Sequence, residues 1–543
     1  MIRYANCKVY TIDKSSNVAE SFVVENGLFA GVGTLQEMRD RFPSAEEVDL
    51  GGAAVLPGLI DGHAHPLMAT EQAAINKTVY PSKFEDLMNW IRENGRRTDK
   101  DKWSYIHRIF PSRIDNFRYP TRKEMDEASP DVPVFLNGAF GGVLNSKALE
   151  LCDITDETNH PGIIKDNEGK ITGALLRSAH NLTPYKIGAN RSFDESGYRE
   201  MLLRYAALGI TGVTEVFLST MTIDKVKVMA ANGKLPIRIS CNFCPGIPKT
   251  LEEAEVLIKD LNLKTGDGDD WFRIGPFKTY VDGGMLTATA YMSEPYGEPA
   301  NKMFGGGKPD YRGVTAYTDP AVLAAIIDVS RKKGWSYTAH CTGDGAVATL
   351  LNAYHILHKK KPLNSERFQF LHGNFMSARS INMITEMGIL WDFQAAWLYR
   401  DAEALDFWLG AKRMKEFLPL KSAIRKGAII CAGSDHMDGL DPDSSVNPYN
   451  PWLGMYAMCS RKSDKGRVFS AGEALTREEA IRAYTINNAY KSGEEKIKGS
   501  IEEGKLADFI ALKSDPFTCD IEELPSVRPF LRSVGGTEMS IKD

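Results

Sequence analysis

Short apolar runs alternate with helix-like segments through the middle of the chain. The apolar runs have the length of buried strands. They end near Ile60, Phe217, Phe243, Val281, Ala339, Leu371, Gln394 and Gly433. One intervening helical segment starts at Asp319, a candidate cap, has Pro320 in its first turn and stops at Gly334. Eight strands that alternate with helices predict an α/β fold, a (β/α)8 TIM barrel.

The pattern at both ends of the chain predicts short strands separated by turns that contain glycine, asparagine and aspartate. Neither end carries a helix long enough to complete a core alone. We therefore expect residues 1–57 and 501–543 to form one small β-domain beside a barrel that spans residues 58–500. The interval between the first two barrel strands, about 150 residues, is too long for one loop and one helix. Residues from about 70 to 190 are therefore predicted as a large insertion after strand 1, on the face where TIM barrels carry active sites.

Composition narrows the class of protein. The chain has 543 residues, of which 43% are hydrophobic and 25% charged, with a net charge of −5. This charge gives no general attraction to nucleic acid or to an anionic membrane. No apolar run approaches the roughly 20 residues of a membrane span, the N-terminus lacks an apolar signal core, and the eight cysteines have no framework spacing. We expect a cytoplasmic protein with a small-molecule substrate and neither nucleic acid nor membrane as partner; a homodimer stays open.

The segment PGLIDGHAHP is the strongest local signal for chemistry. His63 and His65 follow an apolar strand and lie two residues apart, so both side chains point to the same side. Two imidazoles in that arrangement can hold one metal ion at about 2.0–2.1 Å. A bare H-x-H also fits a polar turn, but the preceding strand and the P-G-x-x-D pattern favour a metal site.

Three further residues occupy equivalent places at the ends of predicted barrel strands. His340 closes WSYTAHC, His372 closes FQFLH, and Asp435 ends AIICAGSD. A lone histidine of this kind is more often a satisfied core residue than a ligand, but two of them downstream of an H-x-H favour ligands. A carboxylate at the end of strand eight can contact the metal and accept a proton from water. The competing interpretation of Asp435 is a turn cap.

Lys278 lies inside the predicted fourth strand, in FRIGPFKTYVDGG. A lysine that points into a barrel is costly unless its charge is paired or removed. A neutral lysine can react with carbon dioxide to give an anionic oxygen ligand that bridges two metals. The alternative is a lysine that faces outward, toward the helices, and periodicity alone does not decide between the two.

These segments together resemble a known family. PGLIDGHAHP, FKTYVDGG, AHCTGDGAV, FLHGN, GSDH and GSIEEGKLADFIAL are each similar to segments of the amidohydrolase superfamily. LNSKALEL, LGITGVTEV and LTREEAIRAYTINNAY resemble the branch that contains N-substituted formamide deformylases (amidohydrolase family 3). The resemblance runs from about residue 48 to the C-terminus.

The resemblance implies a metal-binding TIM barrel with a terminal β-sandwich that hydrolyses an amide or related C–N bond of a small molecule. The attacking water would be activated by one or two divalent metal ions, zinc being the expected metal. Its implied metal ligands are His63, His65, Lys278, His340, His372 and Asp435, with Lys278 as a carboxylated bridge. Asp435 would accept the proton of the water and pass it to the leaving nitrogen, and His372 or His340 would help to hold the oxyanion.

Two positions depart from the family pattern. The family has a histidine before N-S-K-A-L, where this chain has Gly141 or Gly142, and an acidic residue after T-G-x-L, where this chain has Arg177. Both departures lie in the predicted insertion, so the metal chemistry is better supported than any inherited substrate. Aromatic residues of the same region and of later loops suggest an apolar substrate group or, equally, core packing: Tyr80, Phe140, Trp397 and Tyr399.

The residues alone leave two other functions open. A deaminase of a cyclic amidine on the same barrel needs a group that protonates the ring nitrogen, and no H-x-x-E follows WSYTAHC. A non-catalytic binding protein would be favoured by the loss of a metal ligand, and every expected ligand is present.

Overall fold

The computed structural model describes residues 1–73, 80–97, 99, 102–185 and 193–540. Its centre is a parallel sheet of eight strands in the order β18-β17-β16-β15-β14-β13-β12-β6. These strands are β6 (Leu59–Ala64), β12 (Ile210–Phe217), β13 (Arg238–Phe243), β14 (Phe272–Tyr280), β15 (Tyr337–Cys341), β16 (Gln369–His372), β17 (Leu390–Gln394) and β18 (Ile430–Gly433). Just beyond β18, the Asp435 N–H donates to the His63 carbonyl and the His65 N–H donates to the His436 carbonyl, both at 2.7 Å. The first and last strands therefore adjoin, and the predicted TIM barrel is confirmed.

Helices surround the barrel strands and cover their apolar side chains. They are α6 (Glu195–Ala207), α7 (Thr220–Ala231), α8 (Leu251–Ile258), α10 (Pro320–Lys332), α11 (Asp344–Lys360), α12 (Ala378–Met387), α15 (Leu420–Arg425), α17 (Arg477–Ala483) and α18 (Ile486–Ser492). The Asp319 side chain accepts from the Ala321 N–H at 2.8 Å and so caps α10, as the sequence predicts. In the described part of the chain, no helix has the length and apolar content that crossing a bilayer requires.

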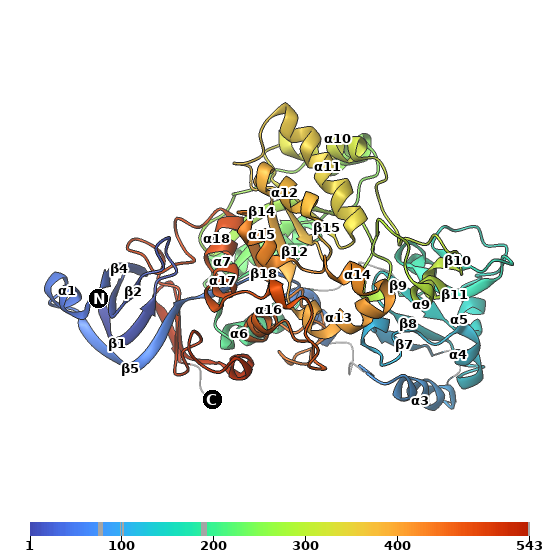
Figure 1. Ribbon diagram of the computed structural model, residues 1–543, viewed down its shortest axis with the longest axis horizontal. Helices are drawn as coiled ribbons and strands as arrows, with labels where there is room; N and C mark the ends of the chain where they lie inside the picture. Colours follow the sequence, from blue (N-terminus) through green and yellow to red (C-terminus); the bar gives the residue numbers. More distant parts are fainter. Residues whose placement is uncertain (74–79, 98, 100–101, 186–192, 541–543) are drawn as a thin grey trace.

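The two ends of the chain share one β-sheet. Strands β1 (Ile2–Tyr10), β3 (Ser21–Glu25), β4 (Leu28–Gly33) and β5 (Glu46–Pro57) come from the N-terminal part, and β19 (Phe509–Leu512), β20 (Pro529–Val534) and β21 (Thr537–Ser540) from the C-terminal part. The long strand β5 joins the two parts, because it pairs with β1 on one side and with β19 on the other. The rings of Tyr4, Phe22, Phe29 and Phe509 meet in the core of this sheet. Figure 1 shows it at one end of the molecule.

The long interval after β6 folds as a separate α/β layer at the opposite end of the molecule (Figure 1). Its sheet has the order β10-β11-β9-β8-β7. The elements are α3 (Phe84–Gly95), β7 (Ser104–His107), α4 (Arg122–Ala128), β8 (Val134–Asn137), β9 (Gly141–Leu144), α5 (Ser146–Leu151), β10 (Ile163–Lys165) and β11 (Ile171–Leu176). Side chains of β8 alternate between its two faces: Val134 and Leu136 pack with α3, and Phe135 packs with α5.

Candidate metal centre

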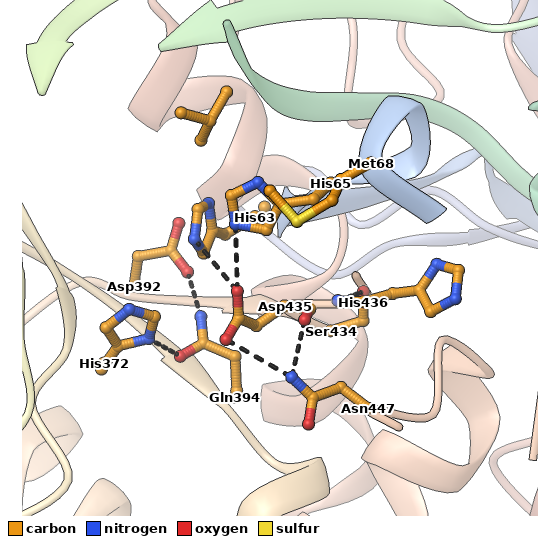
Figure 2. A network of polar contacts seen from close by, with 12 residues as sticks. His63, His65, Met68, His372, Asp392, Gln394, Ser434, Asp435, His436 and Asn447 are labelled. Carbon is orange, nitrogen blue, oxygen red and sulfur yellow. Dashed lines mark hydrogen bonds and ion pairs between the residues drawn. The ribbon is translucent and has the colours of Figure 1, made fainter. Parts of the chain in front are cut away.

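The carboxyl end of β6 brings two histidines to Asp435. His63 Nε2 lies 3.4 Å and His65 Nε2 3.2 Å from Asp435 Oδ1. One ligand atom from each of the three residues lies within 4.8 Å of the other two, and all three residues are buried. Figure 2 shows the two imidazoles converging on the carboxylate. The H-x-H of the sequence and the aspartate after strand eight therefore meet at one point.

Lys278 approaches the same point from β14. Its side chain is 1% exposed, and its Nζ lies 3.5 Å from His63 Nε2. Lys278 therefore points into the barrel, which excludes the outward-facing alternative.

His340 and His372 occupy the neighbouring side of the barrel mouth. Their ring centroids are 4.4 Å apart, and the ring of His372 is 5.5 Å from that of His63. His340 Nε2 lies 2.9 Å from the Gly283 carbonyl, and His372 Nδ1 lies 2.6 Å from Gln394 Oε1. Both partners are acceptors, so these ring nitrogens carry the protons. Nδ1 of His340 and Nε2 of His372 keep their lone pairs and are the atoms able to bind a metal.

A chain of buried polar groups fixes the orientation of His372. Gln394 Nε2 donates to Asp392 Oδ1 at 3.1 Å, which places the amide oxygen of Gln394 toward the imidazole. Asp392 forms a buried ion pair with Lys491 of α18, and Lys491 also donates to the Gly62 carbonyl. Figure 2 shows the steps from His372 through Gln394 to Asp392. Groups of this kind behind a ligating histidine set its tautomer and ring orientation.

Asp61 and Asn447 hold the segments that carry the ligands. Asp61 accepts from the His63 N–H at 3.1 Å, from the Ser434 N–H at 3.0 Å and from Ser434 Oγ at 2.6 Å. It thereby ties the end of β6 to the end of β18, and burial raises the pKa of Asp61 to about 7. Asn447 donates to the Asp435 carbonyl at 2.7 Å and approaches Oδ2 of the same residue at 3.4 Å.

The charge states suit cation binding. Burial lowers the pKa of His63, His65 and His340, and lowers the pKa of His372 to about 4. These imidazoles are therefore neutral at neutral pH and have lone pairs available. Burial alone would raise the pKa of Asp435, but the hydrogen bond from His65 and the nearby Lys278 side chain outweigh it and keep that pKa below its usual range. Neutral imidazoles beside an ionised carboxylate are a donor set that fits a divalent metal such as zinc.

The predicted aromatic residues divide into two groups. Phe140 and Trp397 line a pocket together with His340 and Asp435, and Trp397 stacks on His372 at 4.9 Å. Tyr80, by contrast, is 38% exposed, and Tyr399 packs at the edge of Tyr456. Two of the four aromatic side chains therefore belong to the site.

Packing explains why this chain has glycine at Gly141 and Gly142, where the family pattern has a histidine. A Cβ at Gly141 would meet the ring of Phe304 at 2.6 Å, and one at Gly142 would meet the Leu136 carbonyl at 2.6 Å. Neither position has room for a histidine side chain in this chain. Phe140, immediately before them, supplies the ring that stacks on His340 at 4.7 Å.

The sequence did not identify the groups that support the candidate ligands, among them Asp61, Gln394 and Asn447. Gln394 marks the predicted end of strand seven, and a polar side chain at a barrel strand end was a usable signal. Asp61 stands two residues before His63, and its place in P-G-x-x-D was a second signal. We find no comparable signal for Asn447, which lies in the loop after β18.

Comparison with known proteins agrees with this geometry. A model of the Amidohydrolase family matches residues 46–543. The N-substituted formamide deformylase of Arthrobacter pascens is 27% identical over 554 residues, covering 97% of each chain. YtcJ of Bacillus subtilis is 28% identical over 533 residues, covering 95% of each. An uncharacterized metal-dependent hydrolase from Pyrococcus horikoshii OT3 has a similar fold, with a TM-score of 0.67 at 20% identity over 96% of this chain and 99% of that one. The chain therefore belongs to the amidohydrolase family.

Proposed function

We propose that this protein is a metal-dependent hydrolase that cleaves an amide or related non-peptide C–N bond of a small molecule. The observation that carries the proposal is the convergence of His63, His65 and Asp435 in a buried cluster beside Lys278. A bound divalent metal, zinc by the preference of this donor set, would lower the pKa of water to about 7 and polarise the scissile carbonyl.

Each residue has a definite part in this proposal. His63, His65 and Asp435 would hold one ion, and His340 and His372 would offer their remaining lone pairs to a second. Asp435 is ionised and buried, so it can accept a proton from the attacking water and pass it to the leaving nitrogen. His372 and His340, set by Gln394 and Gly283, stand where they can help to hold the developing oxyanion.

We also propose that Lys278 carries a carbamate in the active enzyme. Its amine would attack carbon dioxide, form the N–C bond and release one proton, which leaves an anionic group with two oxygen atoms. The burial of Lys278 and its 3.5 Å approach to His63 support a role at the metal centre rather than at the surface. An anionic bridge would balance two divalent ions better than Asp435 alone.

Metal analysis combined with a substrate screen tests the proposal. We expect purified protein to contain one or two equivalents of divalent metal and to hydrolyse at least one member of a panel of N-formyl, N-acetyl and cyclic amides. Chelation should abolish turnover and zinc should restore it. The double variant His63→Asn, His65→Asn should lose metal, whereas His355→Asn on α11 should retain it. Full turnover by metal-free protein would overturn the proposal.

A further inference from the structure

Arg177 holds a cationic group beside the candidate metal centre. It is the first residue after β11, and its N–H donates to the Phe140 carbonyl at 3.0 Å. Its guanidinium carbon lies 4.9 Å from the ring centre of Tyr280 and 5.2 Å from that of Phe140. The insertion and barrel strand β14 thus each supply one aromatic ring that positions this side chain.

The same two rings contact His340. Phe140 stacks on it at 4.7 Å, and the ring centre of Tyr280 lies 5.1 Å from it. Phe140 also lines the pocket that contains Asp435. Arg177 and the candidate metal ligand His340 therefore share the same two aromatic neighbours.

Within the described residues, the N–H groups of the Arg177 guanidinium have no hydrogen-bond acceptor. Among the described residues, no hydrogen bond or ion pair engages its side chain, and its only recorded partners are the two rings. The segments outside those residues contain only Asp101 and Asp543 as acidic residues. Its charged neighbour on the insertion is another cation, Arg108, whose own carboxylate neighbours are Asp438 and Asp435.

An unpaired guanidinium between aromatic rings is suited to a planar anion. Arginine presents N–H groups in a fixed fork that matches the two oxygens of a carboxylate, while rings on its face restrict its rotation. Arg177 and Arg108 are both positively charged and repel each other. A negatively charged group is therefore favoured beside them. Phe140, which packs against Arg177, also lines the pocket that Trp397 and Asp435 border.

We infer that Arg177 binds a carboxylate of the substrate, so that the substrate class is an amide with a carboxylate a few bonds from the scissile C–N bond, as in an N-acyl amino acid. This inference rests on the proposed hydrolase function and specifies its substrate. It also gives a physical role to the residue at which the chain departs from the acidic position of its family.

Matched pairs of substrates test this inference in the metal-loaded, full-length protein. N-benzoylglycine and N-formylphenylalanine carry the carboxylate, and their carboxamides have the same shape without the charge. We expect kcat/KM to be about 10–100-fold higher for the acids, the range that charge-assisted hydrogen bonds supply. Arg177→Met should remove this preference by lowering kcat/KM for the acids and change the values for the carboxamides less than about threefold. Arg177→Lys should retain part of the preference, because it keeps the charge without the fork.

The matched control is Arg199→Met, which removes one positive charge from the exposed face of α6. It should leave the preference of the wild-type protein unchanged. Equal turnover of acids and carboxamides by the wild-type protein would overturn the inference and leave the hydrolase proposal intact. A loss that Arg177→Met causes equally for both substrates would also overturn it, because Arg177 would then act only as a clamp on Phe140 and Tyr280.

A binding measurement distinguishes a failure of this inference from a failure of the proposed hydrolase function. If the wild-type protein hydrolyses none of these compounds, calorimetric titration with N-benzoylglycine and its carboxamide decides the matter. Tighter binding of the acid that disappears in Arg177→Met supports the carboxylate site even without turnover. Equal binding of both compounds overturns it.

Discussion

Asp435 and His372 share a backbone conformation that residues with a Cβ rarely adopt. Their φ angles are 52° and 79°. Such conformations cost about 1–3 kcal/mol each and persist where the surroundings enforce them, often at functional sites. For Asp435 the enforcement comes from the hydrogen bond to the His63 carbonyl and from Asn447. Backbone strain therefore includes the two residues to which the proposed chemistry assigns the proton and the oxyanion.

Replacing Asp435 by asparagine should separate proton transfer from folding. Asp435→Asn keeps the shape and the contact with Asn447, but an amide is a poor proton acceptor. We expect turnover to fall by about 10²–10⁴-fold, the usual contribution of a general acid–base group. Steady-state kinetics and circular dichroism measure the two effects. Turnover close to that of the wild type would contradict the assignment of Asp435.

Gln394 should contribute to metal affinity, although it is not one of the candidate metal ligands. In Gln394→Met the imidazole of His372 loses the acceptor for its Nδ1 proton, so the tautomer and the ring orientation are no longer fixed. We expect metal affinity to fall by about 10–100-fold, as for other groups behind a ligating histidine. Competition with a chelator measures the affinity.

Gln369 provides the matched control for that experiment. It is a buried glutamine on β16, the strand that ends in His372, and its Oε1 has no hydrogen-bond partner among the described residues. Gln369→Met removes a similar side chain from the barrel without touching a candidate ligand, and metal affinity should stay within about threefold of the wild type. Equal losses in both variants would show that Gln394 acts through barrel packing alone.

At the residue scale, the sequence predicted the candidate ligands but not the groups behind them. His63 and His65 stand in a local motif, and His340, His372 and Asp435 each follow an apolar run. The function of Asn447 depends on a loop that returns to Asp435, and nothing local marks such a contact. The inward direction of Lys278 also required tertiary structure, because a strand in a barrel is apolar on both faces.

At the element scale, the barrel strands were predictable because their apolar runs are continuous. The runs predicted to end at Phe217, Phe243 and Gln394 end at those residues. The first run continues to Ala64, because polar residues at a barrel mouth still pair as strand. The predicted interval from about 70 to 190 contains the five-stranded sheet, whose strands have three to six residues and pair out of sequence order. Hydrophobic periodicity does not specify such a pairing order.

The insertion should be sensitive to mild acid through His180. This side chain is buried against Phe135, its Nε2 has no partner among the described residues, and burial followed by the charge of Arg177 lowers the pKa of His180 to about 4. In the unfolded chain the pKa of histidine is about 6.5. Between these values the unfolded state binds the extra proton, so stability falls as the pH falls from about 6.5 toward 4.

His180→Gln should reduce that acid sensitivity. From pH 7 to pH 5 we expect the wild-type protein to lose about 2 kcal/mol of unfolding free energy through this group, and the variant to lose correspondingly less. Urea unfolding at pH 7, 6 and 5 measures the difference. His355→Gln, a partly exposed position on α11, serves as the control and should follow the wild-type curve. A His180→Gln curve parallel to that of the wild type would contradict the buried, neutral state of His180.

At the scale of the whole molecule, one buried ion pair connects the barrel to the sheet formed by the two ends of the chain. Arg238 of β13 donates to both carboxylate oxygens of Asp508, at 2.7 and 2.9 Å, and the two side chains are 2% and 5% exposed. Arg238 also donates to the Asp270 carbonyl, and Asp508 accepts from the Gly535 N–H at 2.7 Å. The ion pair and its hydrogen bonds therefore link three parts of the chain: β13, the segment at Asp270 and the C-terminal segment that contains Asp508 and Gly535.

Asp508→Asn should consequently destabilise the whole chain rather than one end. It leaves the buried guanidinium of Arg238 without a counter-charge, and breaking a buried pair in this way typically costs about 3–5 kcal/mol. Glu503→Gln is the matched control: it breaks the pair with Arg41, whose N–O distance is 2.6 Å but whose side chains are 47% and 48% exposed. Exposed pairs contribute about 0–1 kcal/mol, so this variant should unfold almost as the wild type does. Thermal unfolding followed by circular dichroism should show a clearly lower midpoint for Asp508→Asn, with metal content at room temperature unchanged because no candidate ligand is touched. Equal midpoints for the two variants would mean that the terminal sheet and the barrel are held together by their apolar contacts, with no net contribution from the charge pair.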